Sequence, residues 1–389
     1  MTVFKGQNAW EQRKLGDLGS VQMNKRIFKD QTSESGEVPF FKIGTFGKKP
    51  DSFISKKLFD EYKSKYPYPE VGDILISASG SIGRTVVYEG EDAYFQDSNI
   101  VWLEHDGRLK NSFLEQFLKR TKWNKIEGST IKRLYNKDIL NKKINLPKLK
   151  EQEKIGQLFQ YLDKTITLHE EKHRQLEQLK KALLQKMFAD ETGYPVLRFK
   201  GFTKKWEQRK LEDLGEILTG STPSTKHTEY YSKNGIPWVT PTDIKRNITF
   251  STPRKLSALG ESVGRIVPKN TLLITCIASI GKNTILGTKG SFNQQINGLI
   301  PRFDKYDLYF LFTQSNLWSQ KMKHKAATGT MQIVNKKDFT NLNTLVPILS
   351  EQRHIGNMFE QLDHLITLHQ HKIDNLKRLK RALLQKMFV

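Results

Sequence analysis

The sequence contains one long segment twice, and this duplication limits the possible folds more than any other feature. Residues 151–188 and 351–388 align without a gap, 200 positions apart, and both end in ALLQKMF. A second repeated segment opens each half, as WEQRKLGDLG from Trp10 and as WEQRKLEDLG from Trp206. A repeat of this length predicts a tandem duplication, in which a globular segment is followed by a helix, twice.

Apolar residues in both copies alternate steps of three and four residues, which is the spacing of a coiled-coil seam. Neither copy contains proline, and glycine occurs only in the first turns. We therefore expect two long helices that pack on each other as an antiparallel coiled coil. Two separate helices, each lying on its own domain, are the alternative, although so narrow a stripe is typical of a helix pair. The predicted seam residues are Ile155, Phe159, Leu162, Ile166, Leu176, Leu183, Ile355, Phe359, Leu362, Ile366, Ile373, Leu376 and Leu383.

Each globular segment is expected to combine short strands with one or two helices. Apolar runs bounded by Gly and Pro predict strands at 74–76, 85–87, 100–103 and 272–275, and helices are predicted at 112–123 and 306–322. The expected fold class is α+β, with two similar mixed α/β domains separated by the helix pair and related by internal pseudo-twofold symmetry. The predicted boundaries are 1–150 for the first domain, 151–190 for the central helix, 191–350 for the second domain, in which 191–205 is a linker, and 351–389 for the C-terminal helix.

The positive charge of the chain lies mainly on the two globular segments. Residues 1–150 contain 27 Lys and Arg against 19 Asp and Glu, and residues 191–350 contain 23 against 11. The helix at 151–190 is balanced at 7 against 7, so most of the formal net charge of +23 lies outside the helices. A polyanion is expected to meet the globular segments. A basic surface that serves only solubility is the alternative.

Cysteine content and hydropathy indicate the compartment. The single cysteine, Cys276, excludes an intramolecular disulfide and fits a reducing environment. The first residues do not form a signal peptide, and the longest apolar run, around 272–280, is too short to span a bilayer. We therefore expect a soluble cytoplasmic protein that does not bind a membrane.

Inside the globular segments the duplication continues, with the apolar residues kept and the polar residues changed. GDILISASGSIGR from Gly72 corresponds to NTLLITCIASIGK from Asn270, and FQDSN from Phe95 corresponds to FNQQ from Phe292. The SIG segment is either an ordinary tight turn that requires glycine or a loop that contacts phosphate. Two copies that keep their core and change their loops predict one scaffold with two recognition surfaces.

Several of these repeated segments resemble the specificity subunit of type I restriction-modification systems. They are WEQRKLxxLG, the GDxLxS and GSIG segment, NKDI and KKDF before Leu146-Pro and Val346-Pro, and EQxxI at the start of each long helix. The resemblance covers essentially the whole chain and implies a non-catalytic subunit with two target-recognition domains, each reading one half of a split DNA site. It implies that the helices set the spacing and dock two modification (methyltransferase) subunits. It also implies that S-adenosylmethionine, ATP and Mg²⁺ are used by modification and restriction subunits, and that this chain holds no cofactor.

Base edges are read through donors and acceptors, chiefly Arg or Lys on guanine and Asn or Gln on adenine. The polar loop residues of both halves are therefore candidates for contact with double-stranded DNA, although many such contacts go to phosphate. The candidates in the first half are Lys42, Thr45, Lys48, Ser79, Ser81, Arg84, Gln96, Ser98, Asn99, Thr130, Lys132 and Arg133. Those in the second half are Thr240, Thr242, Lys245, Arg246, Thr275, Ser279, Lys282, Asn293, Gln294, Gln295, Thr330 and Gln332.

Two other function classes remain open on sequence grounds. A stand-alone DNA-binding regulator with a coiled coil would bind specifically without a partner. A nuclease would use Asp51, Glu61 and Lys63, which follow the pattern PD…ExK, but that chemistry needs both carboxylates on adjacent strands around Mg²⁺. His169 and His173 have the i, i+4 spacing of zinc ligands, yet the second copy has isoleucine at 373, so we expect seam histidines and no metal.

Overall fold

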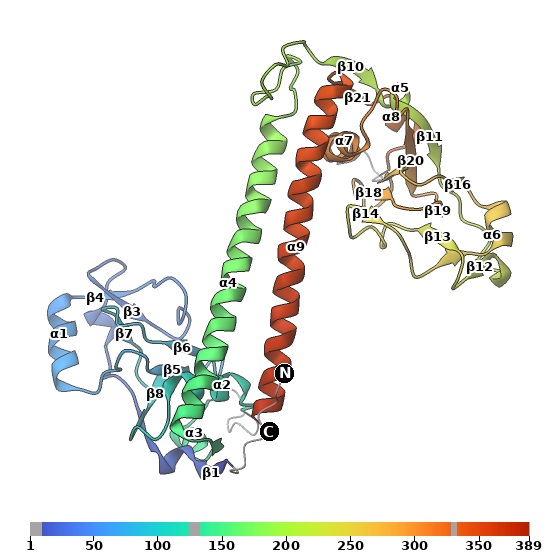
Figure 1. Ribbon diagram of the computed structural model, residues 1–389. Helices are drawn as coiled ribbons and strands as arrows, with labels where there is room; N and C mark the ends of the chain where they lie inside the picture. The colour runs from blue at the N-terminus through green and yellow to red at the C-terminus, as the bar shows by residue number, and fades with distance from the viewer. Residues whose placement is uncertain (1–9, 124–132, 328–332, 389) are drawn as a thin grey trace. The chain divides into compact units, whose positions relative to one another are not determined.

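The computed structural model describes residues 10–123, 133–327 and 333–388, and the chain divides into two compact units. Unit 1 comprises residues 1–170 and 371–389, and unit 2 comprises residues 171–370. Each long helix therefore begins in one unit and ends in the other (Figure 1).

Unit 1 begins with the first repeated segment and contains most of the first half of the chain. Its elements are β1 (Glu11–Lys14), η1 (Leu15–Asp17), β2 (Gly19–Gln22), η2 (Lys29–Gln31), β3 (Val38–Phe41), β4 (Phe53–Ile54), α1 (Lys56–Lys65), β5 (Ile74–Ser77), β6 (Thr85–Val87), β7 (Tyr94–Phe95), β8 (Ile100–His105), α2 (Asn111–Arg120), α3 (Asn136–Leu140), β9 (Lys143–Leu146) and the first part of α4 (Leu149–Lys186).

Unit 2 repeats this order with additional short strands. Its elements after α4 are β10 (Glu207–Lys210), α5 (Leu211–Leu214), β11 (Gly215–Thr219), η3 (Thr228–Tyr230), β12 (Tyr231–Ser232), β13 (Ile236–Val239), β14 (Ile248–Thr249), β15 (Lys255–Leu256), α6 (Ala258–Val263), β16 (Ile266–Val267), β17 (Leu272–Thr275), β18 (Asn283–Leu286), β19 (Gly290–Phe292), β20 (Ile296–Pro301), α7 (Leu308–Ala327), α8 (Lys336–Thr340), β21 (Asn343–Val346) and the first part of α9 (Leu349–Met387).

The described sheets of the two units follow one plan. In unit 1 the strand orders are β2-β8-β5-β6 and β4-β3-β7, with β3 and β7 parallel. In unit 2 the corresponding orders are β11-β20-β17-β18 and β15-β13-β19, with β13 and β19 parallel. Unit 2 extends the first of these sheets by β14 and the second by β12 and β16. The predicted α+β class with two similar mixed domains is confirmed.

The repeated WEQRK segments are short strands that close each unit. β1 pairs antiparallel with β9, and β10 pairs antiparallel with β21, with Glu11 opposite Leu146 and Glu207 opposite Val346. The tryptophan before each strand is directed into the hydrophobic core, where Trp206 packs edge-on against Phe188 at 6.0 Å between ring centroids. The segment is therefore repeated because both units need the same closing strand and the same anchor.

The repeated EQxxIG segments fix the start of each long helix. The Gln152 side chain donates to the Pro147 carbonyl at 2.9 Å and accepts from the Lys110 amide at 2.9 Å. Gln352 makes the same pair of bonds in unit 2, at 2.8 and 3.0 Å. A side chain in place of Gly156 would meet the Ser112 hydroxyl at 2.0 Å, so glycine is required where α2 crosses α4.

Within each unit the two long helices run antiparallel. In unit 1, Phe159 of α4 lies 6.4 Å from the Phe388 ring, and Asp163 bonds to Lys380, so the residue number falls along α9 as it rises along α4. In unit 2, Phe188 packs on Phe359 at 5.9 Å. The predicted antiparallel helix pair is therefore confirmed, and the predicted seam residues are all buried or half-buried.

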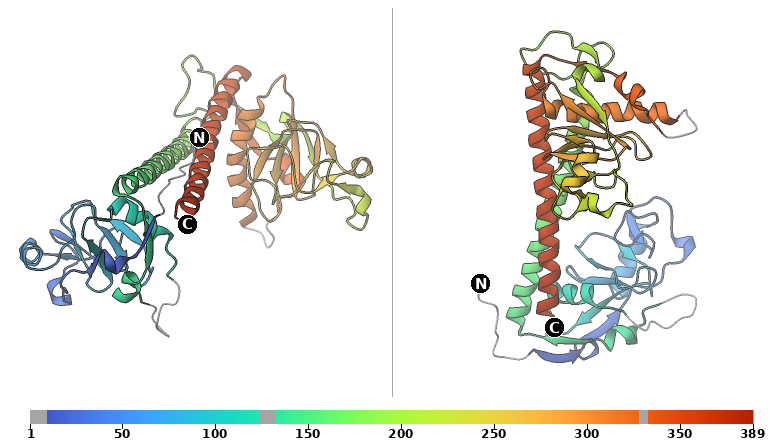
Figure 2. Two further views of the ribbon diagram at one scale, coloured as in Figure 1. Left: turned by 60° about the horizontal axis from the view of Figure 1, so that its bottom comes forward. Right: turned by 90° about the vertical axis from the view of Figure 1, so that its right-hand side faces the viewer.

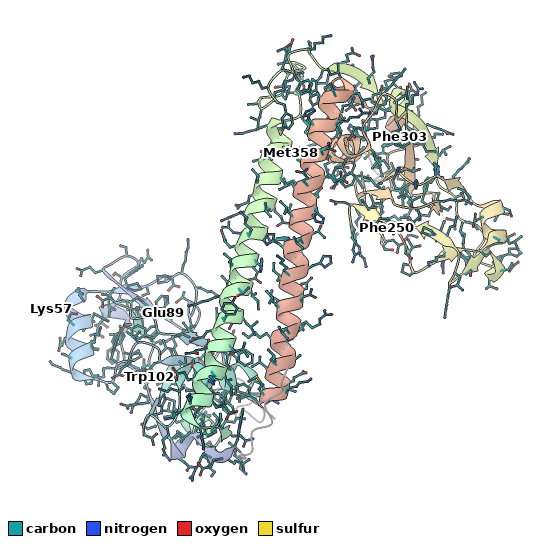
Figure 3. The ribbon with its side chains drawn as sticks, in the orientation of Figure 1. Lys57, Glu89, Trp102, Phe250, Phe303 and Met358 are labelled. Atoms are coloured by element: carbon teal, nitrogen blue, oxygen red, sulfur yellow. The ribbon has the colours of Figure 1, made fainter. Side chains whose placement is uncertain are left out.

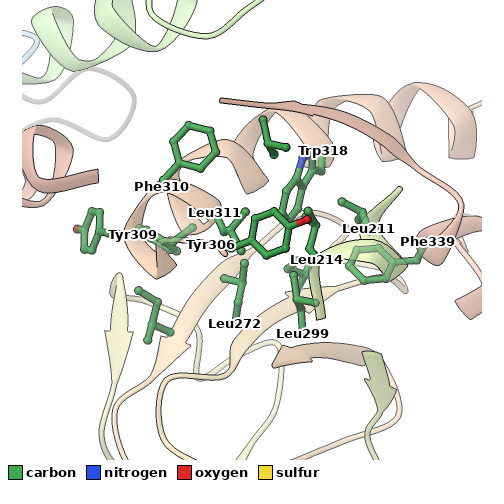
Figure 4. Close-up of a cluster of buried hydrophobic side chains, with 14 of the residues drawn as sticks. Leu211, Leu214, Leu272, Leu299, Tyr306, Tyr309, Phe310, Leu311, Trp318 and Phe339 are labelled. Atoms are coloured by element: carbon green, nitrogen blue, oxygen red, sulfur yellow. The ribbon is translucent and has the colours of Figure 1, made fainter. Parts of the chain in front are cut away.

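The core of unit 2 is built from both sheet and helix residues. Leu272 and Leu299 of the sheet lie beneath Phe310 and Trp318 of α7 (Figure 4). Figure 2 shows α7 between this sheet and the adjoining part of α9, which contributes Phe359 to the same cluster. The corresponding cluster of unit 1 contains Phe113 of α2, Phe159 of α4 and Phe388, which follows α9. A second cluster of unit 1 contains Trp102 (Figure 3).

Several helix boundaries differ from the sequence prediction, although the division into recognition domains and spacer helices stays a prediction. α4 ends at Lys186 rather than at 190, because Phe188 turns into the core and stacks on Phe310 at 5.4 Å. α2 ends at Arg120, before the predicted end at 123, whereas α7 continues to Ala327, past the predicted end at 322.

Candidate nucleic-acid interface

A hairpin turn after β5 and after β17 has the same internal hydrogen bonds in both units. The Ser77 hydroxyl donates to the Ser81 carbonyl and accepts from the Arg84 amide at 2.9 Å. The Thr275 hydroxyl makes the same two bonds, to residues four and seven positions later, at 2.5 and 2.8 Å. Both hydroxyls belong to buried residues, so the backbone of each turn, residues 77–84 and 275–282, is fixed by a buried side chain, and we call it the stapled turn.

The backbone of this turn is left-handed at matching positions. Gly83 and Gly281 have φ of 78° and 83°, and Gly80 has φ of 61°. At the position of Gly80, unit 2 has Ala278 with φ of 60°. A residue with a Cβ atom is strained in this conformation. Ala278 therefore costs unit 2 free energy that Gly80 does not cost unit 1.

In unit 1 the turn lies against two further candidate loops. Arg84 donates from Nη2 to a carbonyl of the loop after β3, residues 42–48, at 3.2 Å. Gln96 accepts an amide of this same loop at its Oε1 at 3.0 Å. Ser79 donates to the Asn99 side chain at 2.7 Å. Most of the described candidates of the first half are therefore in one cluster, at the edge of the sheets where β3, β5 and β7 end.

The corresponding cluster in unit 2 contains equivalent hydrogen bonds. Lys282 donates from Nζ to the Pro241 carbonyl at 3.2 Å, as Arg84 does to its neighbouring loop in unit 1. The Cys276 amide donates to the Gln295 carbonyl at 2.8 Å, and the equivalent bond in unit 1 joins Ala78 to Asn99 at 2.8 Å. Burial raises the pKa of the Cys276 thiol to about 12, so this residue is a neutral part of the scaffold.

The candidate residues differ in how accessible their side chains are. Among the described ones, Lys48, Ser81, Arg84, Thr242, Lys245, Arg246, Ser279, Lys282 and Gln294 are exposed, and most of the others are half-buried. Thr275 is fully buried and its hydroxyl is occupied by the staple, so it cannot contact DNA and the prediction for this residue is corrected. Thr130, Lys132, Thr330 and Gln332 lie outside the described residues.

Arg133 is also part of the cluster. It donates from Nη2 to the Ser98 carbonyl at 2.7 Å, which connects the segment before α3 to the loop after β7. Ser98 has φ of 60° and is therefore a second strained residue beside the candidate surface. The Asn293 side chain is nearly buried and bonds to both the amide and the side chain of Gln295, so it shapes the loop.

One segment of the cluster was not found from the sequence. The chain that follows β2 and β11 runs beside the loop after β7 and β19. In unit 1, Arg26 donates from Nε to the Asp97 carboxylate at 3.0 Å. In unit 2, the Thr222 hydroxyl donates to the Gln294 side-chain carbonyl. These partners are about 70 positions apart, and the polar residues differ between the copies, so no spacing or repeat in the sequence indicates them.

A lysine of the seam is paired with an aspartate in each unit. Lys180 donates to Asp363 at 2.5 Å, and the other carboxylate oxygen accepts from the buried Tyr309 hydroxyl at 2.9 Å. In unit 1, Lys380 donates to Asp163 at 2.5 Å. A polar pair in an apolar seam fixes the register of the helices, because a shifted register leaves the charges unpaired.

The nuclease pattern does not form a site. Glu61 and Lys63 lie on helix α1, where Glu61 bonds to Lys65 at 3.0 Å and Lys63 lies over the Tyr68 ring at 4.8 Å. Asp51 is paired with Lys42 at 2.9 Å. The two carboxylates are thus not on adjacent strands, which the metal chemistry of such nucleases requires.

No group of three His, Cys, Asp or Glu side chains within 10–123, 133–327 and 333–388 is arranged to hold a metal ion, and His173 lies 3.6 Å from Glu177. Among the helices in the described part of the chain, none combines the length and the hydropathy that a bilayer crossing needs.

Comparison with known proteins decides the family. The model of the type I restriction modification DNA specificity domain matches the chain twice, at residues 7–178 and 203–378. The chain belongs to this family. The resemblance expected from the repeated segments is therefore confirmed, and each match begins near a repeated WEQRK segment.

Individual relatives resemble the chain over different lengths and at different levels of identity. A putative type I restriction enzyme specificity subunit of Haemophilus influenzae is 59% identical over 155 residues, which cover 40% of this chain and 40% of that protein. The putative MjaX specificity subunit of Methanocaldococcus jannaschii is 23% identical over 96% of this chain and 92% of its own length. The crystal structure of a type I restriction-modification system S subunit from M. genitalium has a TM-score of 0.69 at 14% identity, covering 100% of this chain and 98% of that one.

Proposed function

We propose that the chain is the non-catalytic DNA-specificity subunit of a type I restriction-modification complex. Unit 1 and unit 2 each read one half of an asymmetric DNA site in two parts. Methylation and cleavage, together with S-adenosylmethionine, ATP and Mg²⁺, belong to modification and restriction subunits. The observation that carries the proposal is that one scaffold occurs twice with the same stapled turn and different exposed side chains around it.

The charge distribution supports DNA as the ligand of both units. The globular segments hold the excess of Lys and Arg, whereas residues 151–190 are neutral overall. Cations such as Lys48, Lys245 and Arg246 are exposed beside the stapled turns. Such cations neutralise phosphates and position a protein on the duplex, while the neighbouring polar side chains read base edges.

The long helices support the proposed roles as spacer and docking surface. α4 and α9 have 38 and 39 residues and would each extend for about 57 Å at 1.5 Å per residue. On α4 in unit 1, Leu158, Tyr161 and Leu168 form a second apolar stripe, and Tyr161 is 70% exposed. On α9 in unit 2, Leu365 and Leu368 are also exposed and lie three residues apart, as Leu158 and Tyr161 do on α4. We assign these stripes to the modification subunits, because exposed apolar stripes of this kind mark sites of protein contact.

A segment exchange tests the proposal. The chain is co-expressed with its modification subunit, and methylated adenines are mapped on genomic DNA. Replacing residues 10–146 with the corresponding segment of another family member should change one part of the methylated site and leave the other part and the spacer unchanged. A change in both parts, or a methylated site with only one part, contradicts the proposal. A stand-alone regulator would instead bind its site tightly without the modification subunit.

A further inference from the structure

Asp97 of unit 1 and Gln294 of unit 2 occupy the same position in the two recognition clusters. The loop after β7 begins with the Gln96 amide bonded to the β3 end at 3.0 Å, and the loop after β19 begins with the Asn293 amide bonded to the β13 end at 3.0 Å. Both loops end at a carbonyl that accepts an amide of the stapled turn. Between these fixed points unit 1 has one residue more than unit 2, and the extra residue is Ser98.

The extra residue is held in place from two sides. The Ser98 amide donates to the Met23 sulfur at 3.3 Å, and its carbonyl accepts from Arg133 at 2.7 Å. Ser98 is left-handed with φ of 60°, a conformation that a serine keeps only when its surroundings determine it. The insertion therefore gives the loop of unit 1 a fixed shape that differs from the loop of unit 2.

The side chain at the shared position is anchored from the same neighbouring segment in both units. Arg26, four residues after β2, bonds to Asp97 at 3.0 Å, and Thr222, three residues after β11, bonds to Gln294. The Ser98 hydroxyl lies 3.2 Å from the same carboxylate oxygen, Oδ2, that accepts from Arg26. Both of these contacts use Oδ2, and the Asp97 side chain is 13% exposed, so Oδ1 is the oxygen left to accept a bond from a ligand.

A carboxylate in a cluster that meets DNA is unfavourable unless it has a specific partner, because phosphates repel it. In the major groove a carboxylate can only accept, and the donors there are the amino groups of cytosine and adenine. At adenine the N7 acceptor is next to the amino group and repels a second acceptor, whereas cytosine has no acceptor at that edge. An amide such as that of Gln294 matches adenine, because it donates to N7 and accepts from the amino group.

We propose that Asp97 reads the amino group of a cytosine in the half-site of unit 1, at the place where Gln294 reads an adenine in the half-site of unit 2. Arg26 is the positioning residue that holds the carboxylate and offsets its repulsion from the phosphates. This inference rests on the proposed function and adds the base chemistry of one position in each half-site.

The test uses the full chain assembled with its modification subunits and a duplex library with randomised half-sites, from which bound DNA is sequenced. Asp97→Asn should lower the preference for one C·G pair over A·T in one half-site by about 5- to 150-fold, since the amide introduced also matches adenine. The other half-site should stay unchanged. Gln294→Glu, the matched variant, should change one A·T pair to C·G in the other half-site only.

Arg26→Ala is the control for a merely structural ion pair. If Asp97 serves only to hold Arg26, both variants should lower affinity for all sequences alike and leave the selected bases unchanged, and that result overturns the inference. A wild-type site with no C·G pair in the half that responds to residue 97 overturns it as well. A wild-type library with no site in two parts overturns the proposed function, and the inference with it.

Discussion

Replacing Asp363 with alanine should destabilise unit 2 much more than replacing Asp163 with alanine destabilises unit 1. The two residues occupy matching positions of the seam, but their surroundings differ. The Asp363 side chain is 7% exposed and accepts from both Lys180 and the buried Tyr309 hydroxyl. The Asp163 side chain is 35% exposed, and its second partner is Lys119 at 3.5 Å.

The expected magnitudes follow from this difference in burial. Removing one partner of a buried ion pair costs about 3–5 kcal/mol, and an unpaired buried hydroxyl costs about 1–3 kcal/mol. Because Lys180 is 26% exposed and can reach water, we expect about 3 kcal/mol for Asp363→Ala. Asp163→Ala removes an interaction that is partly in solvent, for which about 1 kcal/mol is expected.

The measurement must report on each unit separately, because a chain with two units does not unfold in one step. Hydrogen exchange followed by mass spectrometry gives the opening free energy of peptides from α4 and α9 in each unit. A double-mutant cycle with Lys180→Met should give a coupling above about 1 kcal/mol. Equal effects of the two alanine variants, or an effect of Asp363→Ala below about 0.5 kcal/mol, would refute the reasoning from burial.

Four further outcomes are expected. Ala278→Gly should raise the stability of unit 2 by about 0.5–1 kcal/mol in hydrogen exchange, and Gly80→Ala should lower that of unit 1 by a similar amount, since both positions are left-handed. Thr275→Val should cost about 2 kcal/mol in the same assay, because a buried staple is lost, whereas Thr275→Ser should be nearly neutral. Cys276 should resist alkylation at pH 8 in the native chain and react fully in urea, because its thiol is buried and its pKa is about 12. The DNA affinity of the complex should fall with log salt at a slope near −8 or steeper, and a slope shallower than about −3 would argue against phosphate contacts.

The helix pair could be predicted because its signal is periodic and present twice. Phe159 and Ile166 are seven residues apart, as are Phe359 and Ile366, and the periodicity of a long helix is visible in the sequence alone. The Lys180 position interrupts that stripe, and its partner Asp363 is on the other helix, so the ion pair could be inferred only once the helices were placed antiparallel.

The recognition cluster was predicted less completely, for a physical reason. Its shape depends on bonds between loops that are distant in the chain, such as Arg26 to Asp97 and Arg133 to Ser98. A list of polar loop residues cannot separate a side chain that faces outward from one that holds the loop, and Thr275 was included although it is fully buried. The sequence shows that FQDSN is one residue longer than FNQQ, but it does not identify Ser98 as the insertion, because the two loops share almost no polar residue.

The exchange of helix ends between the two units has a consequence for the order in which the chain is made. Unit 2 consists of residues 171–370 in one continuous stretch, whereas unit 1 needs residues 371–389, and Phe388 fills the space between Phe113 and Trp10. At 5–20 residues per second, a ribosome takes roughly 10–40 s to add the 200 residues that separate these parts. The first half of unit 1 must therefore wait, with its core open, while unit 2 can already fold. A premature stop near the end of the message would damage the unit that was started first.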